Sequence, residues 1–297
     1  IPLCGCAIDI GTTTVTGVLM DLESGRLLAK ASSGNGQIRY GADVINRIIE
    51  QSKPGGVKKL QDAIIKESYG KRRRYALGGA LDSVMNYPFR TAVLDFIHCR
   101  SDAPALRDFL RSQRLNYPEP MYYSLMNLLG SHDVERILTA LATPAEIKTL
   151  SREQQAALSF SREELALAER RERLCALLQF AIPGVPSVYY GDEQGMCGGG
   201  DPFNRAPFAD RGSPLRDYYA ALAALRNENP VLQMGEAAFF APTAEVLAVV
   251  RYDGTGNAFL FLLNRGEATE VTVDLSVCGR TPLTAQIGAL EGRWQRL

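Results

Sequence analysis

The sequence predicts a mixed α/β protein built from three successive patterns, and three observations carry that prediction. Short apolar runs separated by polar turns open the chain as a β-meander. After Tyr69, strand-like runs alternate with helical stretches, a βαβ rhythm that favours parallel strands with helices packed outside. From about Val231 the helices stop and antiparallel hairpin patterns take over.

The N-terminal elements are three strands followed by two helices. Apolar runs separated by turns such as Gly11-Thr12-Thr13-Thr14 predict strands at 4–10, 15–21 and 26–32. Apolar residues at helical spacing predict helices at 42–51 and 57–67, divided by Pro54-Gly55-Gly56.

The remaining elements follow the same two periodicities. Short apolar runs predict strands at 81–85, 122–129 and 186–190. Helical stretches lie between and after them, at 91–99, 105–114, 162–180 and 215–226. The runs at 246–252 and 258–264, joined by Asp253-Gly-Thr-Gly-Asn257, predict a hairpin, and 270–275 continues the antiparallel pattern.

Composition excludes several classes of function. The 297 residues carry 33 Lys+Arg and 33 Asp+Glu, so no net charge attracts nucleic acid or an anionic membrane, and the basic run 71–74 is too short to change this. Six cysteines without a CxxC pair predict a reducing compartment, and we expect a cytoplasmic location. Two histidines exclude a multi-histidine metal site, and we expect no cofactor. No apolar run is long enough to span a membrane.

A candidate catalytic or binding site lies where an apolar strand at 124–129 ends in Gly130-Ser131-His132-Asp133. The C-terminal edge of a strand is where a (β/α)8 barrel places its active site. Some fifty residues later, a proline-bounded strand runs into Tyr189-Tyr190-Gly191-Asp192-Glu193, followed by the glycine-rich segment 198–205. A lone His-Asp pair also fits a helix start after a strand, but the whole set in this order indicates a site.

These segments resemble the α-amylase family of glycoside hydrolases (family 13), most closely its neopullulanase and cyclomaltodextrinase members. The stretches 69–75 (Tyr-Gly-Lys-Arg-Arg-Arg-Tyr) and 81–90 (Leu-Asp-Ser-Val-Met-Asn-Tyr-Pro-Phe-Arg) add to the likeness, which covers 69–297. It implies the last three βα units of a partial (β/α)8 barrel over 69–230, with strands at 81–86, 124–129 and 186–190. A C-terminal antiparallel β-sandwich over 231–297 would follow.

The resemblance also implies roles for residues. Asp133 would be the carboxylate that stabilises the transition state, and His132 its hydrogen-bonding neighbour. Asp201 and Arg205 would contact sugars of an α-glucan or maltodextrin substrate. The family's nucleophilic Asp and acidic Glu both precede the stretch that resembles 69–75, and neither can be found in this chain. We therefore expect an α-glucan or cyclodextrin hydrolase by family that is itself inactive; the alternative is a glucan-binding module without chemistry.

The N-terminal quarter resembles a different family. Asp9-Ile-Gly11-Thr12-Thr13-Thr14, together with 37–47, is similar to the start of the actin-like (ribonuclease H-like) ATPase domain in reductive activators of corrinoid proteins. The resemblance covers 1–67. In it, Asp9 would hold magnesium through water, and Gly11, Thr12 and Thr13 would cradle phosphate. The second phosphate loop and the adenosine pocket are missing from the sequence, so ATP hydrolysis is not expected.

Two families therefore meet between Glu67 and Tyr69 without a linker. This favours a fused or misassembled reading frame. The alternative is a genuine protein whose fragments have found a new packing. The rival function is ATP-dependent activation of corrinoid proteins, carried by 1–67 alone, and nucleotide-dependent stabilisation would favour it.

Overall fold

The computed structural model describes residues 4–10, 14–21, 26–34, 53, 83–210 and 212–297. Contacts divide the chain into two compact units, Ile1–Glu67 and Ser68–Leu297. The predicted helices at 42–51 and 57–67 and the junction at Ser68 lie outside the described residues.

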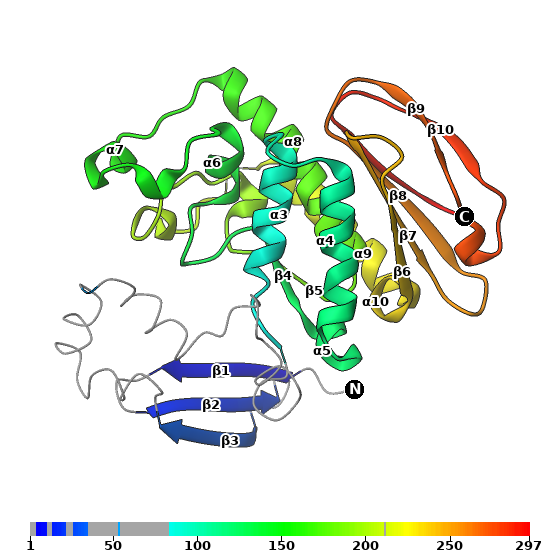
Figure 1. Cartoon of the computed structure of the whole chain (residues 1–297). Helices are drawn as coiled ribbons and strands as arrows, with labels where there is room; N and C mark the ends of the chain where they lie inside the picture. The colour runs from blue at the N-terminus through cyan, green and yellow to red at the C-terminus, as the bar shows by residue number, and fades with distance from the viewer. Residues whose placement is uncertain (1–3, 11–13, 22–25, 35–52, 54–82, 211) are drawn as a thin grey trace. The chain divides into compact units, whose positions relative to one another are not determined.

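The N-terminal unit contains the predicted β-meander. Strands β1 (Cys4–Ile10), β2 (Thr14–Asp21) and β3 (Leu27–Gly34) form an antiparallel sheet in the order β1-β2-β3 (Figure 1). Thr16 lies opposite Ser32, and their hydroxyl oxygens are 2.9 Å apart. This cross-strand hydrogen bond supports the register of β2 against β3.

In the C-terminal unit the first described elements are two helices with side-chain caps. The Asn86 side chain accepts from the Phe89 N–H at the start of α3 (Tyr87–Ile97). Asp102 accepts from the Ala105 N–H, at 2.8 Å, at the start of α4 (Ala103–Asn116). Each cap satisfies an N–H that has no partner within its helix, and a proline in the first turn has no such N–H to satisfy. Both helices begin earlier than the apolar spacing predicted.

Parallel pairing is present but shorter than predicted. β4 (Met126–Leu128) pairs in parallel with β5 (Val185–Ser187), and Met85 forms a single parallel bridge to Met126. The strand predicted at 124–129 is wrong at its start, because α5 (Glu119–Ser124) occupies the preceding residues. The strand predicted at 186–190 begins at Val185 and ends at Ser187, shortly before Gly191 takes the left-handed conformation (φ 85°). The described strands do not close a barrel.

The long helix α8 (Arg162–Ala181) forms the centre of the larger core. Ser161 and Glu164 make a capping box at its start, as the Ser-x-x-Glu spacing requires. The helix packs against α6 (Ile137–Ala142), α9 (Pro214–Glu228) and the C-terminal sheet. Its C-terminal half is buried from Leu174 to Ala181, so the helix packs on every side there; Gln179, the polar residue of this stretch, donates to the Asn127 and Ser187 carbonyls.

The C-terminal elements form two antiparallel sheets. Strands β6 (Glu236–Phe240), β7 (Val246–Tyr252), β8 (Ala258–Asn264) and β11 (Glu291–Arg296) pair in the order β11-β8-β7-β6. β9 (Thr269–Val273) pairs with β10 (Leu283–Ile287). The predicted hairpin at 246–264 is confirmed residue for residue. Two short α-helices, α7 (Arg152–Ala156) and α10 (Pro230–Met234), and short 3-10 helices at Ile147–Thr149, Asp192–Gln194, Phe203–Arg205 and Ser276–Cys278 complete the described part of this unit.

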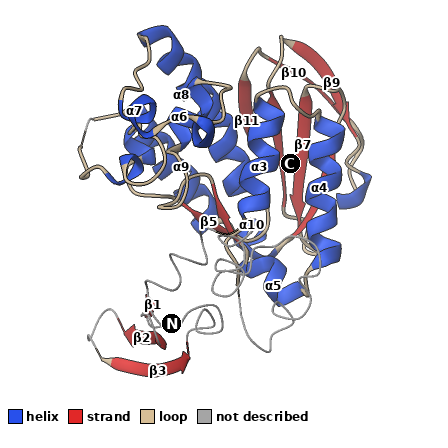
Figure 2. Ribbon diagram, turned by 60° about the vertical axis from the view of Figure 1, so that its left-hand side comes forward, coloured by secondary structure: helices blue, strands red, loops and turns tan. Residues whose placement is uncertain are grey.

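The continuous apolar runs of β7 and β8 are explained by burial of both faces. Leu247, Val249 and Phe261 face the core that contains α8, whereas Val250 and Leu262 face β9 and β10. Figures 1 and 2 show the helices on one side of the four-stranded sheet and β9 and β10 on the other. Among the described residues, no helix has the length and apolar character needed to cross a membrane.

Candidate functional site

The predicted His-Asp pair lies in the loop that follows β4. The Asp133 Oδ1 atom is 3.2 Å from His132 Nε2, and Asp133 Oδ2 accepts from the Tyr87 hydroxyl at 3.3 Å. The Ser131 hydroxyl is 2.9 Å from the same tyrosine oxygen and accepts from the Asp133 N–H. Both side chains of the pair are partly exposed and can therefore reach a ligand.

Tyr87 is a site residue that the sequence reasoning missed, although its segment carried part of the resemblance. Burial raises the pKa of Tyr87 to about 12, so its hydroxyl keeps its proton at neutral pH. It is then available to donate to Asp133. The signal available in sequence was its place directly after Asn86, at the start of a helix that follows a strand-like run.

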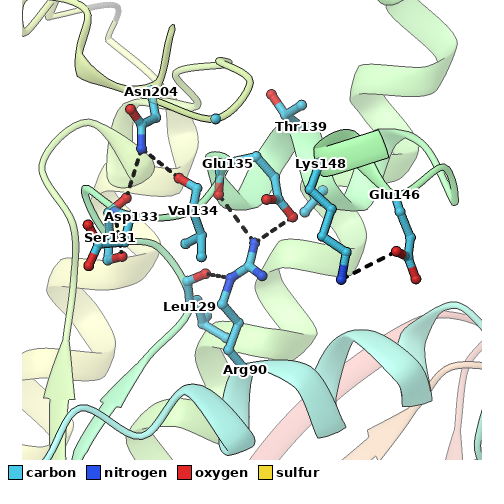
Figure 3. Close-up of polar contacts among 12 residues, drawn as sticks. Arg90, Leu129, Ser131, Asp133, Val134, Glu135, Thr139, Glu146, Lys148 and Asn204 are labelled. Atoms are coloured by element: carbon cyan, nitrogen blue, oxygen red, sulfur yellow. Dashed lines mark hydrogen bonds and ion pairs between the residues drawn. The ribbon is translucent and has the colours of Figure 1, made fainter. Parts of the chain in front are cut away.

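Asn204 holds the loop from the opposite side. Its buried side-chain amide donates to three backbone carbonyls, those of His132 at 2.9 Å, Val134 at 2.7 Å and Ser131 at 3.3 Å. Figure 3 shows Asn204 with Ser131 and Val134. One amide group thus joins the glycine-rich segment to the loop that carries Asp133. No periodicity signals such a contact.

The two other predicted sugar-contacting residues lie beside Asn204. Asp201 and Arg205 form an ion pair, with Nε 2.8 Å from Oδ1, and both side chains are about half-exposed. Arg205 also donates through Nη2 to the His132 carbonyl at 3.2 Å. The structure therefore brings Arg205 to the His-Asp loop, and Asp201 follows through its pairing with Arg205.

Arg90 fixes the far end of the same loop. Its guanidinium donates to the Leu129 carbonyl at 2.7 Å and to the Glu135 carboxylate at 3.0 Å (Figure 3). Burial alone would raise the pKa of Glu135, but the charge and hydrogen bond of Arg90 outweigh it and lower that pKa. The loop is thus bounded by an ion pair as well as by β4.

A cluster with a buried ion pair at its centre joins this loop to the one after β5. The Arg136 guanidinium lies over the rings of Tyr189 and Tyr190, 4.9 and 4.7 Å from their centroids. It donates to the Tyr190 carbonyl at 2.5 Å and to Asp192 Oδ1 at 3.3 Å. Burial raises the pKa of Asp192 to about 7, against the opposing charge of Arg136. A Cβ on Gly130 would come within 2.2 Å of Asp192 Oδ2, so only glycine fits there.

The candidate phosphate residues cannot be placed as a site. Asp9 lies in β1, where its backbone pairs with Thr16. Gly11, Thr12 and Thr13 lie outside the described residues.

Replacing Asn204 tests the role of its amide. In Asn204→Asp, a carboxylate would face three carbonyl oxygens and repel them, and each would lose the hydrogen bond from Asn204, although the His132 carbonyl keeps the one from Arg205. We expect the free energy of unfolding to fall by about 2–3 kcal/mol, measured by urea denaturation. The exposed Asn227→Asp is the control and should change it by less than about 1 kcal/mol. A near-neutral Asn204→Asp would contradict this role.

Comparison with protein families gives two matches. Residues 56–212 match the model described as alpha amylase, catalytic domain, and residues 4–70 match the RACo middle region. These two ranges overlap at 56–70, where the sequence placed the change between families.

Individual relatives agree with the first match. An amylopullulanase of Thermoanaerobacter thermohydrosulfuricus is 36% identical over 234 residues, covering 71% of this chain and 15% of its own. Neopullulanase 2 of Thermoactinomyces vulgaris is 31% identical over 228 residues, 73% of this chain and 34% of its own. This chain therefore spans only a minor part of these curated relatives.

Solved structures agree as well. The ligand-free cyclic α-maltosyl-(1→6)-maltose hydrolase of Arthrobacter globiformis is 27% identical, with a TM-score of 0.63, over 86% of this chain and 54% of that one. The same enzyme in complex with its cyclic saccharide is 26% identical, with a TM-score of 0.62, over 85% of this chain and 54% of that one. In complex with maltose it is 28% identical, with a TM-score of 0.61, over 86% of this chain and 55% of that one.

Proposed function

Because this chain belongs to the α-amylase family, we propose that it binds α-glucans or maltodextrins around Asp133 and does not cleave them by itself. The observation that carries the proposal is the placement of His132 and Asp133. Both are partly exposed at the C-terminal end of β4, and hydrogen bonds from Tyr87, Asn204 and Arg205 hold the loop.

The chemistry of the site suits a neutral, hydroxyl-rich ligand. Asp133 can accept hydrogen bonds from sugar hydroxyls, and the imidazole of His132 can bind a hydroxyl beside it. The half-exposed Asp201 and Arg205 offer an acceptor and a fork of donors for vicinal hydroxyls further along the ligand. The Arthrobacter structures with maltose and with the cyclic tetrasaccharide support saccharides of this class as the ligand to test first.

The absence of cleavage follows from the number of carboxylates that the reaction requires. Retaining glycosidases need a nucleophile and a proton donor about 5 Å apart, on opposite sides of the bond that breaks. The family resemblance gives Asp133 neither role, and it places both of those residues in a part of the barrel with no counterpart in this sequence. Asp133 alone cannot form or break a glycosyl–enzyme bond.

Titration calorimetry with maltose and maltohexaose tests the proposed binding, and a reducing-sugar assay tests the proposed lack of cleavage. We expect binding in the millimolar range, about −4 kcal/mol, and at least tenfold weaker binding in Asp133→Asn. We expect no release of reducing sugar from maltodextrin or cyclodextrin above background. The exposed Asp217→Asn, on α9, is the matched control and should bind as the wild type does.

Two outcomes would contradict the proposal. Equal affinity in the wild type and Asp133→Asn would remove the binding site from this loop. Reducing-sugar release that disappears in Asp133→Asn would show that the chain is an active hydrolase.

A further inference from the structure

A groove that the proposed function does not use lies beside α3. Its volume is about 400 Å³, within the roughly 300–1,000 Å³ of small-molecule sites. One wall is a single face of α3, since its lining residues recur at helical spacing from Tyr87 to His98. Residues 134–148, which follow Asp133, form the other wall. Asp133 belongs to neither wall, so the groove is a second concavity next to the proposed site.

The charges that line the groove occur in pairs. The three ion pairs join Arg90 to Glu135 at 3.0 Å, Lys148 to Glu146 at 3.3 Å and Arg100 to Asp95 at 3.3 Å, and Figure 3 shows the first two. Burial lowers the pKa of His98, so its imidazole adds no charge at neutral pH. A phosphate or carboxylate would meet three carboxylates in this groove, and an amine would meet three cations. The lining therefore favours a neutral ligand.

Two lining side chains have hydrogen-bonding groups that the described protein does not use. The Arg90 side chain is 9% exposed, and its Nε and Nη2 donate to Leu129 and Glu135, whereas Nη1 donates to no described residue. His98 Nε2 lies 2.8 Å from the Ala140 carbonyl, which only accepts, so Nε2 carries the proton and Nδ1 is left as an acceptor. The groove therefore offers both a donor and an acceptor, which a hydroxyl group can use together.

Apolar side chains complete the lining. Leu94, Ala140 and Ile147 are buried and line the groove. A pyranose ring suits this combination, because its edge carries hydroxyls and its faces carry C–H groups. We propose that the groove is a second saccharide site, which takes a short neutral saccharide with its hydroxyls at Arg90 and His98. This inference goes beyond saccharide binding at Asp133 and does not rest on it.

The two histidines of the chain provide one reporter for each site. His98 lines the groove, and His132 lies beside Asp133. In the full chain with isotope-labelled histidine, we expect maltose to shift the His98 imidazole NMR signal until it saturates. The midpoint should be at least tenfold higher than that of His132, because the charged groups of the groove are already paired within the protein. The signals are assigned with His132→Gln.

Variants in the groove test the assignment without touching the Asp133 loop. Thr91, an exposed residue of α3, lines the groove, and Thr91→Trp should fill it and raise the His98 midpoint at least tenfold while the His132 response stays unchanged. Lys148→Met removes a 79% exposed donor from the rim and should raise the His98 midpoint severalfold. The matched control is Ala221→Trp, at an exposed position of α9 away from the groove, which should respond as the wild type does.

The outcomes separate the two sites. A His98 signal that does not shift with maltose, or that shifts equally in Thr91→Trp, would overturn the groove proposal and leave the proposed function standing. A His98 shift that Asp133→Asn abolishes would be transmitted from the other site and would also overturn it, as would a shift produced by inorganic phosphate but not by maltose. A saturating His98 shift without any His132 shift would count against the proposed function only.

Discussion

Arg251→Met should destabilise the C-terminal unit more than any other single substitution considered, by about 5 kcal/mol in the free energy of unfolding. The Arg251 side chain, on β7, is fully buried and donates to five backbone carbonyls at 2.7–3.2 Å, those of Ala181, Val231, Leu232, Gly235 and Glu236. Methionine fills similar space but has no donor, so each of the five carbonyls would lose one hydrogen bond; those of Val231 and Gly235 would keep another, from the Gly235 N–H and the Tyr123 hydroxyl.

The position of these carbonyls explains why an arginine is buried without a carboxylate partner. The last carbonyls of a helix have no partner within it and carry the negative end of its dipole. Arg251 binds the carbonyl of Ala181 at the end of α8, and Arg226 binds those of Phe180 and Ile182. Burial, together with the neighbouring charge of Arg226, lowers the pKa of Arg251 to about 9, which still leaves it charged at neutral pH.

Urea denaturation followed by circular dichroism checks the expected loss. Arg296→Met, at an exposed arginine on β11 that donates to the Asn257 side chain and lies 6.0 Å from the centre of the Phe259 ring, is the matched control and should cost less than about 1 kcal/mol. If Arg251→Met does not fold at all, Arg251→Lys can be measured instead. Lysine keeps the positive charge but has fewer N–H donors, so its free energy of unfolding should fall by less. An Arg251→Met variant within 1 kcal/mol of the wild type would contradict the assigned role.

Asp192 should make the C-terminal unit less stable as the pH rises from about 4 to about 7. Burial raises its pKa to about 7 from the usual 3.8, so in this range the folded state holds a proton that the unfolded state has released. Stability from this group is therefore complete below the unfolded pKa and is lost as the pH rises through the folded one. Three pH units correspond to about 4 kcal/mol at most.

Asp192→Asn isolates this contribution, because asparagine resembles the protonated acid. We expect the wild type and the variant to be similarly stable near pH 4, and the variant to be more stable by up to about 4 kcal/mol near pH 8. Buried Glu172, whose pKa is raised by burial and by the charge of Asp192, adds a slope of the same sign in both proteins, and this slope is smaller in the variant because the Asp192 charge is gone. Exposed Asp217→Asn is the control and should follow the wild type. A stability difference that stays constant with pH, or that favours the wild type at high pH, would show that Asp192 is ionised beside Arg136 throughout.

Local elements were predictable from the sequence because neighbouring residues determine them. The hairpin β7–β8 was located residue for residue, since its two apolar runs and the turn at 253–257 contain all of its pairing information. The capping box of α8 is likewise a pattern of four adjacent residues. The order of the His132-Asp133 and Asp201–Arg205 segments also identified the family before any geometry was known.

Elements that depend on a neighbour were predicted less well. Strand boundaries at 124–129 and 186–190 were wrong because apolar character does not distinguish a strand from the buried end of a helix, such as α5, or from a buried loop. Parallel strands take their length from the partner to which they pair, and β4 and β5 share only three register pairs.

The sequence by itself determined the family and the presence of two unrelated parts, and it predicted which residues would form a saccharide site. Only the tertiary structure decided what holds them in place. Tyr87 and Asn204 contact the Asp133 loop from about 45 residues before it and 70 residues after it, and Arg251 reaches Ala181 across a separation of 70 residues. Such contacts leave no periodic pattern in the sequence. They depend on which distant segments pack together in the fold, and on the need of buried carbonyls for a hydrogen-bond donor.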